Sequence, residues 1–292
     1  MRNFVLIIGG MLLSASTFAA SAGSNTSISR SSSSSFGGGS GIKAANNQIG
    51  YQSIASNVDY TEIGNGQLGT RTGVLDTEAG PVSGRALYFS AMNDVLFGND
   101  YVKATYDQSN GLTNYIGGAL PNGTYGSVVG TSSAILTNYS ARYGRGFEMR
   151  GASMLTPYLE FGAHKWDRGI NFGEAYTNLY YGVGLLGQYS PGSRWVLSID
   201  ALAGRTTQSA IVVASGPGLI GFSGVLGNSE LYKLGVSADY ALTPRFHWNV
   251  GLDYTVFTYG ISATYPSGAS VAWEPDSQTN YITFRLGLGW GF

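Results

Sequence analysis

The residues of this chain that could carry out acid–base chemistry are two histidines and the carboxylates near them. Glu160 and His164 lie four positions apart in a segment whose large apolar residues recur at every second position. Side chains at even spacing share one face of an extended strand. Glu160 and His164 could therefore form a carboxylate–histidine pair, in which His164 is the candidate general base. His247 follows a tight turn, and we expect it to be an ordinary interface residue. The chain has no cysteine, which excludes a thiol nucleophile, a disulfide framework and a Cys-ligated metal.

The overall charge does not indicate a strongly charged partner. The chain has 16 Lys and Arg residues and 17 Asp and Glu residues, which gives a formal net charge of −1. Charged residues make up 11% of its 292 residues, against about a quarter in typical soluble domains. We therefore expect no nucleic-acid partner.

The β-strand is the element that must position the candidate residues, and the end of the chain shows its pattern most clearly. The apolar series there is Ile282, Phe284, Leu286, Leu288, Trp290 and Phe292, with Thr, Arg and Gly residues between its members. The same period of two recurs at residues 155–163, 179–185, 195–201, 232–242 and 248–256. These segments have about the length that a tilted strand needs to cross a bilayer.

Four fainter segments bring the predicted count to about ten strands, with eight or twelve as the alternatives. They lie at residues 54–63, 84–92, 101–107 and 136–147. In the last of them, Tyr139, Ala141 and Tyr143 share the apolar face, which places Arg145 on that face as well. An outward Arg is tolerable near an interface, where its cost falls to roughly 0–1 kcal/mol.

The connections between these strands are unevenly distributed. Short turns at residues 150–153, 190–194 and 243–246 fall on one side, and long connections at 64–82, 108–133, 205–229 and 262–279 fall on the other. This asymmetry is typical of transmembrane barrels, and a closed barrel satisfies every backbone group in hydrocarbon. The predicted fold is all-β, a transmembrane antiparallel up-and-down β-barrel with short periplasmic turns and long extracellular loops.

The chain is predicted to have three parts. Residues 1–22 combine a basic start, an apolar run and a small-residue cleavage pattern, which indicates a signal peptide cut after Ala22 or Ala19. Residues 23–48 begin with an excess of Ser and Gly, and we expect a flexible leader. The barrel takes residues 49–292.

Over residues 50–292 the strand pattern and the aromatic ending resemble the superfamily of small bacterial outer-membrane β-barrel proteins. The resemblance implies an outer-membrane location after export, contact with outer-membrane lipid and folding by the barrel-assembly machinery. It also implies a C-terminal assembly signal, made of Phe284, Leu286, Leu288, Trp290 and Phe292. The ten-stranded outer-membrane proteases look similar in architecture but place an Asp two residues before their catalytic His, where this chain has Gly162.

Charged residues of both signs are predicted to face the lumen of the barrel. They are Asp59, Lys103, Asp107, Arg142, Glu160, His164, Asp200, Lys233, Asp239, Asp253 and Arg285. Because buried charges must be paired, we expect an ion-pair network that plugs most of the lumen. The alternative is a polar path for small solutes.

The sequence therefore predicts a non-catalytic barrel whose surface loops make structural or adhesive contact with an extracellular ligand. A narrow porin-like channel is the alternative function. An autotransporter translocator is disfavoured because the short Ser-rich leader makes a poor passenger. A rim hydrolase based on His164 is disfavoured because the required partner residues are missing from its motif. No cofactor and no metal site are predicted.

Overall fold

The computed structural model of the chain describes residues 38–67, 71–119, 123–217, 220–267 and 270–292. The predicted signal peptide and residues 23–37 of the predicted leader lie outside these residues. The described residues form one α-helix, α1 (Gly38–Asn46), and fourteen β-strands. No helix among them is long and apolar enough to span a membrane.

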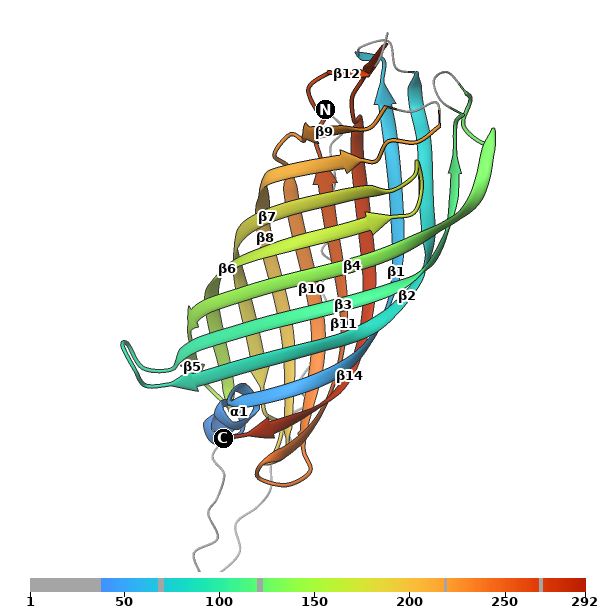
Figure 1. Cartoon of the computed structure of the whole chain (residues 1–292). Coiled ribbons are helices and arrows are strands. Elements are labelled where there is room, and N and C mark those ends of the chain that lie inside the picture. The colour runs from blue at the N-terminus through green and yellow to red at the C-terminus, as the bar shows by residue number, and fades with distance from the viewer. Residues whose placement is uncertain (1–37, 68–70, 120–122, 218–219, 268–269) are drawn as a thin grey trace, which may run out of the picture. The chain divides into compact units, whose positions relative to one another are not determined.

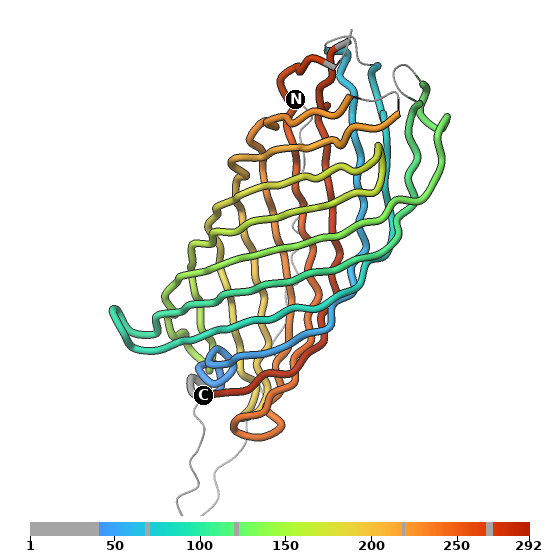
Figure 2. The backbone as a smooth tube through the Cα atoms, viewed as in Figure 1, coloured from blue at the N-terminus to red at the C-terminus, as the bar shows by residue number. Residues whose placement is uncertain are grey.

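Ten of the strands form a closed antiparallel barrel (Figures 1 and 2). In order around the ring they are β1 (Gln48–Asn65), β2 (Thr72–Asn93), β3 (Asp100–Gly117), β4 (Val128–Arg145), β6 (Ser153–Arg168), β7 (Glu174–Tyr189), β8 (Trp195–Val213), β10 (Glu230–Ala241), β11 (Phe246–Tyr259) and β14 (Asp276–Gly291). The others are β5 (Phe147–Met149), β9 (Phe222–Val225) and the hairpin of β12 (Tyr265–Ser267) with β13 (Ser270–Ala272). The predicted all-β barrel of about ten strands is confirmed.

The first and last strands close the ring. β1 and β14 run antiparallel from Gln48 opposite Gly291 to Ile63 opposite Asp276. β14 pairs on its other side with β11, and β10 lies between β11 and β8. Each of the ten strands therefore has a neighbour on both sides, as a sheet surrounded by hydrocarbon requires.

The period of two places large apolar side chains on the outer face of the barrel. We call the end that holds α1 and Phe292 the lower end, and the end that holds β9, β12 and β13 the upper end (Figure 1). Along β1 the outward residues change from Ile49 and Tyr51 near the lower end to Asn57 and Asp59 higher up. The outward apolar residues thus form a band, and the strands continue above it.

The first four strands are longer than predicted. β2 has 22 residues and β1, β3 and β4 have 18 each, so they extend into segments predicted as the long loops 64–82 and 108–133. The loop prediction is wrong there because the outward residues above the apolar band are mostly polar, which resembles a loop although the pairing continues. Arg145 faces outward at the lower end of β4, where its guanidinium lies over the rings of Phe97 and Phe147.

Helix α1 lies at the lower mouth of the barrel and packs against β2, β6, β7 and β8 (Figure 1). Ile42 is fully buried, and Asn46 exchanges hydrogen bonds of 2.7 and 3.2 Å with Gln188. Lys43 forms an ion pair with Asp94 at 3.4 Å. The prediction of a flexible leader up to residue 48 is therefore wrong for its last residues, because Ile42 and Asn46 anchor them to the barrel.

Candidate functional site

The middle of the lumen contains charged side chains of both signs, which we call the ion-pair layer. Its members are Lys103, Asp107, Arg142, Glu160, Asp200, Lys233, Asp253 and Arg285. Arg142 bridges the carboxylates of Glu160 and Asp200. The side chain of Glu160 is fully buried, so this bridge replaces the water that its charge would otherwise need.

Lys233 and Arg285 form the remaining ion pairs of this layer. Lys233 Nζ lies 2.8 Å from Glu160 Oε1 and 2.7 Å from the Tyr180 hydroxyl. Arg285 Nη2 donates to Asp253 Oδ1 at 2.6 Å. Four cationic and four anionic side chains make up the layer, so its formal charges balance.

His247 points into the lumen below the ion-pair layer. Its Nδ1 lies 2.6 Å from Asp239 Oδ1, and Asp239 Oδ2 accepts a hydrogen bond from Gln48 Nε2 at 3.1 Å. The expectation that His247 is an interface residue is wrong. β11 begins at Phe246, so the alternation of the strand turns the next residue inward, where its side chain is 2% exposed.

His164 lies above the ion-pair layer and is held by neutral partners. Its Nδ1 is 2.5 Å from Asn138 Oδ1, and its Nε2 is 3.1 Å from the Tyr281 hydroxyl. The imidazole stacks on the ring of Phe257 with 4.6 Å between centroids. Glu160, the predicted partner, is bound by the ion-pair layer instead, so the predicted His–carboxylate pair does not form.

Aromatic side chains fill the lumen above His164, and we call them the aromatic layer. They are Tyr60, Trp166, Tyr176 and Tyr259, all 2% exposed or less. The Trp166 ring lies 5.3 Å from that of Tyr60 and 5.8 Å from that of Tyr176. These centroid distances are those of favourable aromatic packing. The layer separates the ion-pair layer from the upper end of the barrel.

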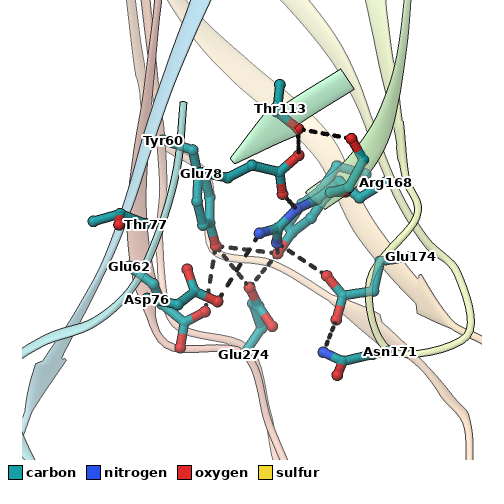
Figure 3. Close-up of polar contacts among 12 residues, drawn as sticks. Tyr60, Glu62, Asp76, Thr77, Glu78, Thr113, Arg168, Asn171, Glu174 and Glu274 are labelled. Carbon is teal, nitrogen blue, oxygen red and sulfur yellow. Dashed lines mark hydrogen bonds and ion pairs between the residues drawn. The ribbon is translucent and has the colours of Figure 1, made fainter. Parts of the chain in front are cut away.

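A third group, which we call the carboxylate cluster, lies at the upper end of the lumen, and Figure 3 shows its polar contacts. It consists of Glu62, Asp76, Glu78, Glu174 and Glu274 around Arg168. Arg168 Nε lies 2.8 Å from Glu78 Oε2, and its Nη1 lies 3.0 Å from Glu174 Oε2. The guanidinium also lies over the Tyr60 ring, 4.4 Å from the centroid. Three of the five carboxyl groups, those of Asp76, Glu78 and Glu174, form ion pairs with this one guanidinium.

Glu274 ties the segment between β13 and β14 to the barrel wall. Its carboxyl group accepts hydrogen bonds from the hydroxyls of Tyr176 and Tyr60, the latter at 3.3 Å (Figure 3). Its backbone N–H donates to Ser262 Oγ at 2.8 Å, and Ser262 N–H donates back to the Glu274 carbonyl at 2.9 Å. These contacts fix Ser262 and Glu274 at the upper end of the lumen.

The carboxylate cluster lies above the apolar band, and burial shifts the pKa values of its carboxyl groups. Burial raises the pKa of Glu274 to about 8, and the neighbouring Glu174 carboxylate adds to the shift. Burial also raises the pKa of Asp76 to about 6, although Arg168 opposes that shift. The pKa of Glu62 is raised by burial and by Glu274. Protons therefore balance part of the negative charge that Arg168 leaves.

The structure places ten of the eleven predicted lumen residues inside the barrel, and Asp59 outside it. Asp59 faces outward because its neighbours Val58 and Tyr60, both 0% exposed, occupy the inner face of β1. The assignment of Asp59 to the lumen is therefore wrong. It assumed a polar interior, whereas the interior at this height is apolar and aromatic.

The prediction missed the carboxylates of the upper cluster. Asp76 and Glu78 lie in a segment predicted as a loop, and Glu274 lies in another. A signal for the first two was present, because the period of two that places Ala86 inward continues backwards along β2 to both residues. Among the described residues, no group of three or more His, Asp and Glu side chains is arranged to hold a metal ion.

Two small cavities lie in the lumen, one above and one below the centre of the ion-pair layer. Their volumes are about 130 and 110 Å³. Both are lined in part by the same residues, Lys103, Arg142, Asp200, Asp253 and Arg285. The two cavities therefore meet at one set of charged side chains.

Comparison with known proteins gives a likeness of structure alone. No protein-family model matches the chain, and no curated protein matches it. The outer membrane protease OmpT from Escherichia coli superposes with a TM-score of 0.55 at 9% identity, over 85% of this chain and 97% of that one. OprG from Pseudomonas aeruginosa gives a TM-score of 0.40 at 13% identity, over 84% and 96%. The likeness to OmpT shows that the chain has the fold of a bacterial outer-membrane β-barrel, and nothing about its activity.

Proposed function

We propose that this chain is an integral outer-membrane protein whose lumen is closed and whose upper, extracellular end makes contact with a surface ligand. The outward apolar band supports insertion into a bilayer. The strands that continue above it would carry the upper end clear of the outer leaflet. Helix α1 and the C-terminal assembly signal, Phe284 to Phe292, would lie on the periplasmic side or in the bilayer.

The filling of the lumen along its height is the observation that carries this proposal. Helix α1 lies at the lower mouth, the ion-pair layer in the middle, and the aromatic layer and the carboxylate cluster above. The cavities of about 130 and 110 Å³ can each hold several water molecules. A solute crossing the barrel would have to separate Arg142 from two carboxylates, and breaking a buried pair costs about 3–5 kcal/mol.

The surroundings of His164 support a non-catalytic role. A general base needs a proton acceptor that a substrate can reach. His164 is 2% exposed, and both of its ring nitrogens are engaged by Asn138 and Tyr281. The ring therefore serves the packing of the lumen.

Exposed apolar side chains at the upper end support a contact function. Leu112, Val129 and Val225 are 66%, 72% and 66% exposed, and they lie above the apolar band. Apolar side chains in this position do not meet lipid and would be available to a surface ligand. We expect the double variant Leu112→Ser/Val129→Ser to lower adhesion of cells that display the chain to immobilised matrix proteins. Val95→Ser, at the lower end, is the matched control.

The closed lumen can be tested by electrical recording. We expect the purified barrel to give no discrete conductance steps in planar bilayers. Its folding is checked in the same preparation by gel mobility, because a closed barrel migrates differently before and after boiling. A folded barrel with regular conductance steps would contradict the closed lumen.

A narrow channel for small solutes is the second candidate function. The observation that favours it is the shared lining of the two cavities, which leaves one layer of charged side chains between them. If this layer opens to let solutes pass, Arg142→Gln should increase the conductance of the barrel in planar bilayers above that of the unchanged chain. The bilayer recording distinguishes the two functions directly.

A further inference from the structure

An open apolar groove crosses the outer wall of the barrel over β2, β3, β4 and β6, and its volume is about 640 Å³. One row of cross-strand neighbours forms its centre, with Phe89 opposite Ala104, Ala104 opposite Ala141, and Ala141 opposite Phe161. The two alanines form a low floor between two phenylalanine rings. Tyr106 packs against a second tyrosine, with 5.0 Å between ring centroids, at the upper edge of this floor.

A polar row runs along the upper side of the groove. Arg85 is opposite Gln108, Gln108 is opposite Thr137, and Thr137 is opposite Lys165. Gln108 Nε2 donates to Thr137 Oγ1 at 3.5 Å. The row therefore carries a cation at each end and hydrogen-bonding groups between them.

Arg85 makes no ion pair within the part of the chain that the structure describes. Leu87 and Phe89 follow it on the same outward face, so its charge stands at the edge of the apolar band. Lys165 is partly compensated, because its Nζ lies 2.8 Å from Asp167 Oδ1. A cation next to hydrocarbon is stabilised by a counter-charge, and for Arg85 that charge has to come from outside the described chain.

We propose that this wall binds one molecule of a bis-phosphorylated, multiply acylated glycolipid of the outer leaflet. An acyl chain would lie over Ala104 and Ala141, and the two phosphates would reach Arg85 and Lys165. Neighbouring strands lie about 4.8 Å apart, so three strand steps separate these two cations by about 14 Å. A glycerophospholipid with one phosphate cannot span that distance, whereas a headgroup with two phosphates can. This inference rests on the outer-membrane location proposed above.

The test measures lipid that remains bound to the folded full-length barrel in detergent, counted by native mass spectrometry. The probes are bis-phosphorylated lipid A, its mono-phosphorylated form and phosphatidylglycerol. We expect Arg85→Gln to weaken binding of the bis-phosphorylated form about tenfold, as for loss of one charge-assisted hydrogen-bonding partner. The mono-phosphorylated form should bind the unchanged chain about tenfold more weakly than the bis-phosphorylated form does.

Two further variants separate the parts of the site. Arg205→Gln removes an outward Arg on β8, opposite Glu230, and should leave binding nearly unchanged. Ala104→Leu/Ala141→Leu fills the floor of the groove and should weaken binding without a change of charge. Because both alanines face outward, this variant is expected to fold.

Two outcomes would overturn the inference. Arg85→Gln and Arg205→Gln could lose equal amounts of bound lipid A, or phosphatidylglycerol could be retained as well as lipid A is. Either result would mean that the wall holds ordinary boundary lipid. The gel mobility of unheated protein is recorded for every variant. A barrel that is folded and detergent-dependent but holds no lipid A contradicts only this inference. A chain that stays monodisperse without detergent contradicts the outer-membrane location as well.

Discussion

The ion-pair layer and the carboxylate cluster lie in the same lumen, but their buried negative charge is balanced in different ways. In the ion-pair layer, four cations face four anions. In the carboxylate cluster, five carboxyl groups lie around the single cation Arg168, and the raised pKa of Glu274 indicates that protons supply part of the balance. The layer lies inside the apolar band and the cluster above it. Within the band, Arg142, Lys233 and Arg285 balance buried carboxylates by ion pairs, whereas above the band protons take part of that role.

The largest expected effect is the loss of Arg142. Arg142→Ala leaves Asp200 without its cation and leaves the fully buried Glu160 with Lys233 alone, so we expect the free energy of unfolding to fall by about 3–5 kcal/mol. Urea unfolding in lipid vesicles, followed by gel mobility, measures this loss. The outward variant Arg85→Ala is the control and should change stability far less. A loss as small as that of the control would show that water already screens the layer.

A smaller loss is expected for Arg168, and it should depend on pH. In Arg168→Met the carboxyl groups of the cluster can take up protons, which limits their repulsion. We expect a loss of about 1–3 kcal/mol near pH 6, of the size found for an unsatisfied buried group, and a larger one near pH 9. The same urea titration at both pH values measures it. Equal losses at the two values would remove the contrast between the regions.

The upper end should loosen as pH rises, independently of the rest of the barrel. The folded-state pKa of Glu274 is about 8, above its ordinary value of about 4.3, so the folded state holds this proton more tightly than the unfolded state. Its stabilising contribution is therefore complete below about pH 4.3 and is lost as pH rises through about 8. Hydrogen exchange at the Ser262 and Glu274 amides, corrected for intrinsic rates, should increase over this range. Glu274→Gln should give a flat profile, and a pH-dependent profile in that variant would contradict the assignment.

The smallest effect is expected outside the lumen, at Asp59. Because Asp59 faces outward above the apolar band, Asp59→Asn should change stability by no more than about 0.5 kcal/mol. Asp253→Asn, which weakens the partner of Arg285, should cost about 1–3 kcal/mol. Thermal unfolding of both variants gives the comparison. The reverse order would mean that β1 is shifted by one residue relative to its neighbours.

The barrel itself could be predicted from the sequence because alternation is a local property. Segments such as residues 155–163 and 282–292 carry an apolar residue at every second position, and the structure contains a barrel strand at each. The same local rule assigned Lys103, Arg142 and Lys233 to the lumen. These three residues lie within the apolar band, where the outer face is mostly apolar and the inner face is not.

Above the band the two faces of a strand no longer differ in this way, and the prediction fails. On β1 the inner face carries Val58 and Tyr60 while the outer face carries Asn57 and Asp59, which is the reverse of the pattern lower down. The carboxylate cluster depends on contacts between distant segments, such as Glu274 with Tyr60 and Tyr176. No single strand contains the information that brings these residues together.

The pairing of β1 with β14 has a consequence for how the molecule is made. Gln48 and Gly291 meet across nearly the whole length of the described chain, so the contact that closes the ring is also among the most distant in sequence. Long-range pairings of this kind form slowly, because the entropy of closing a long loop is lost before any contact compensates for it. Until that seam forms, β1 and β14 each expose an edge on which another chain could add. A cell that makes this protein must therefore shield it from aggregation until the ring is closed.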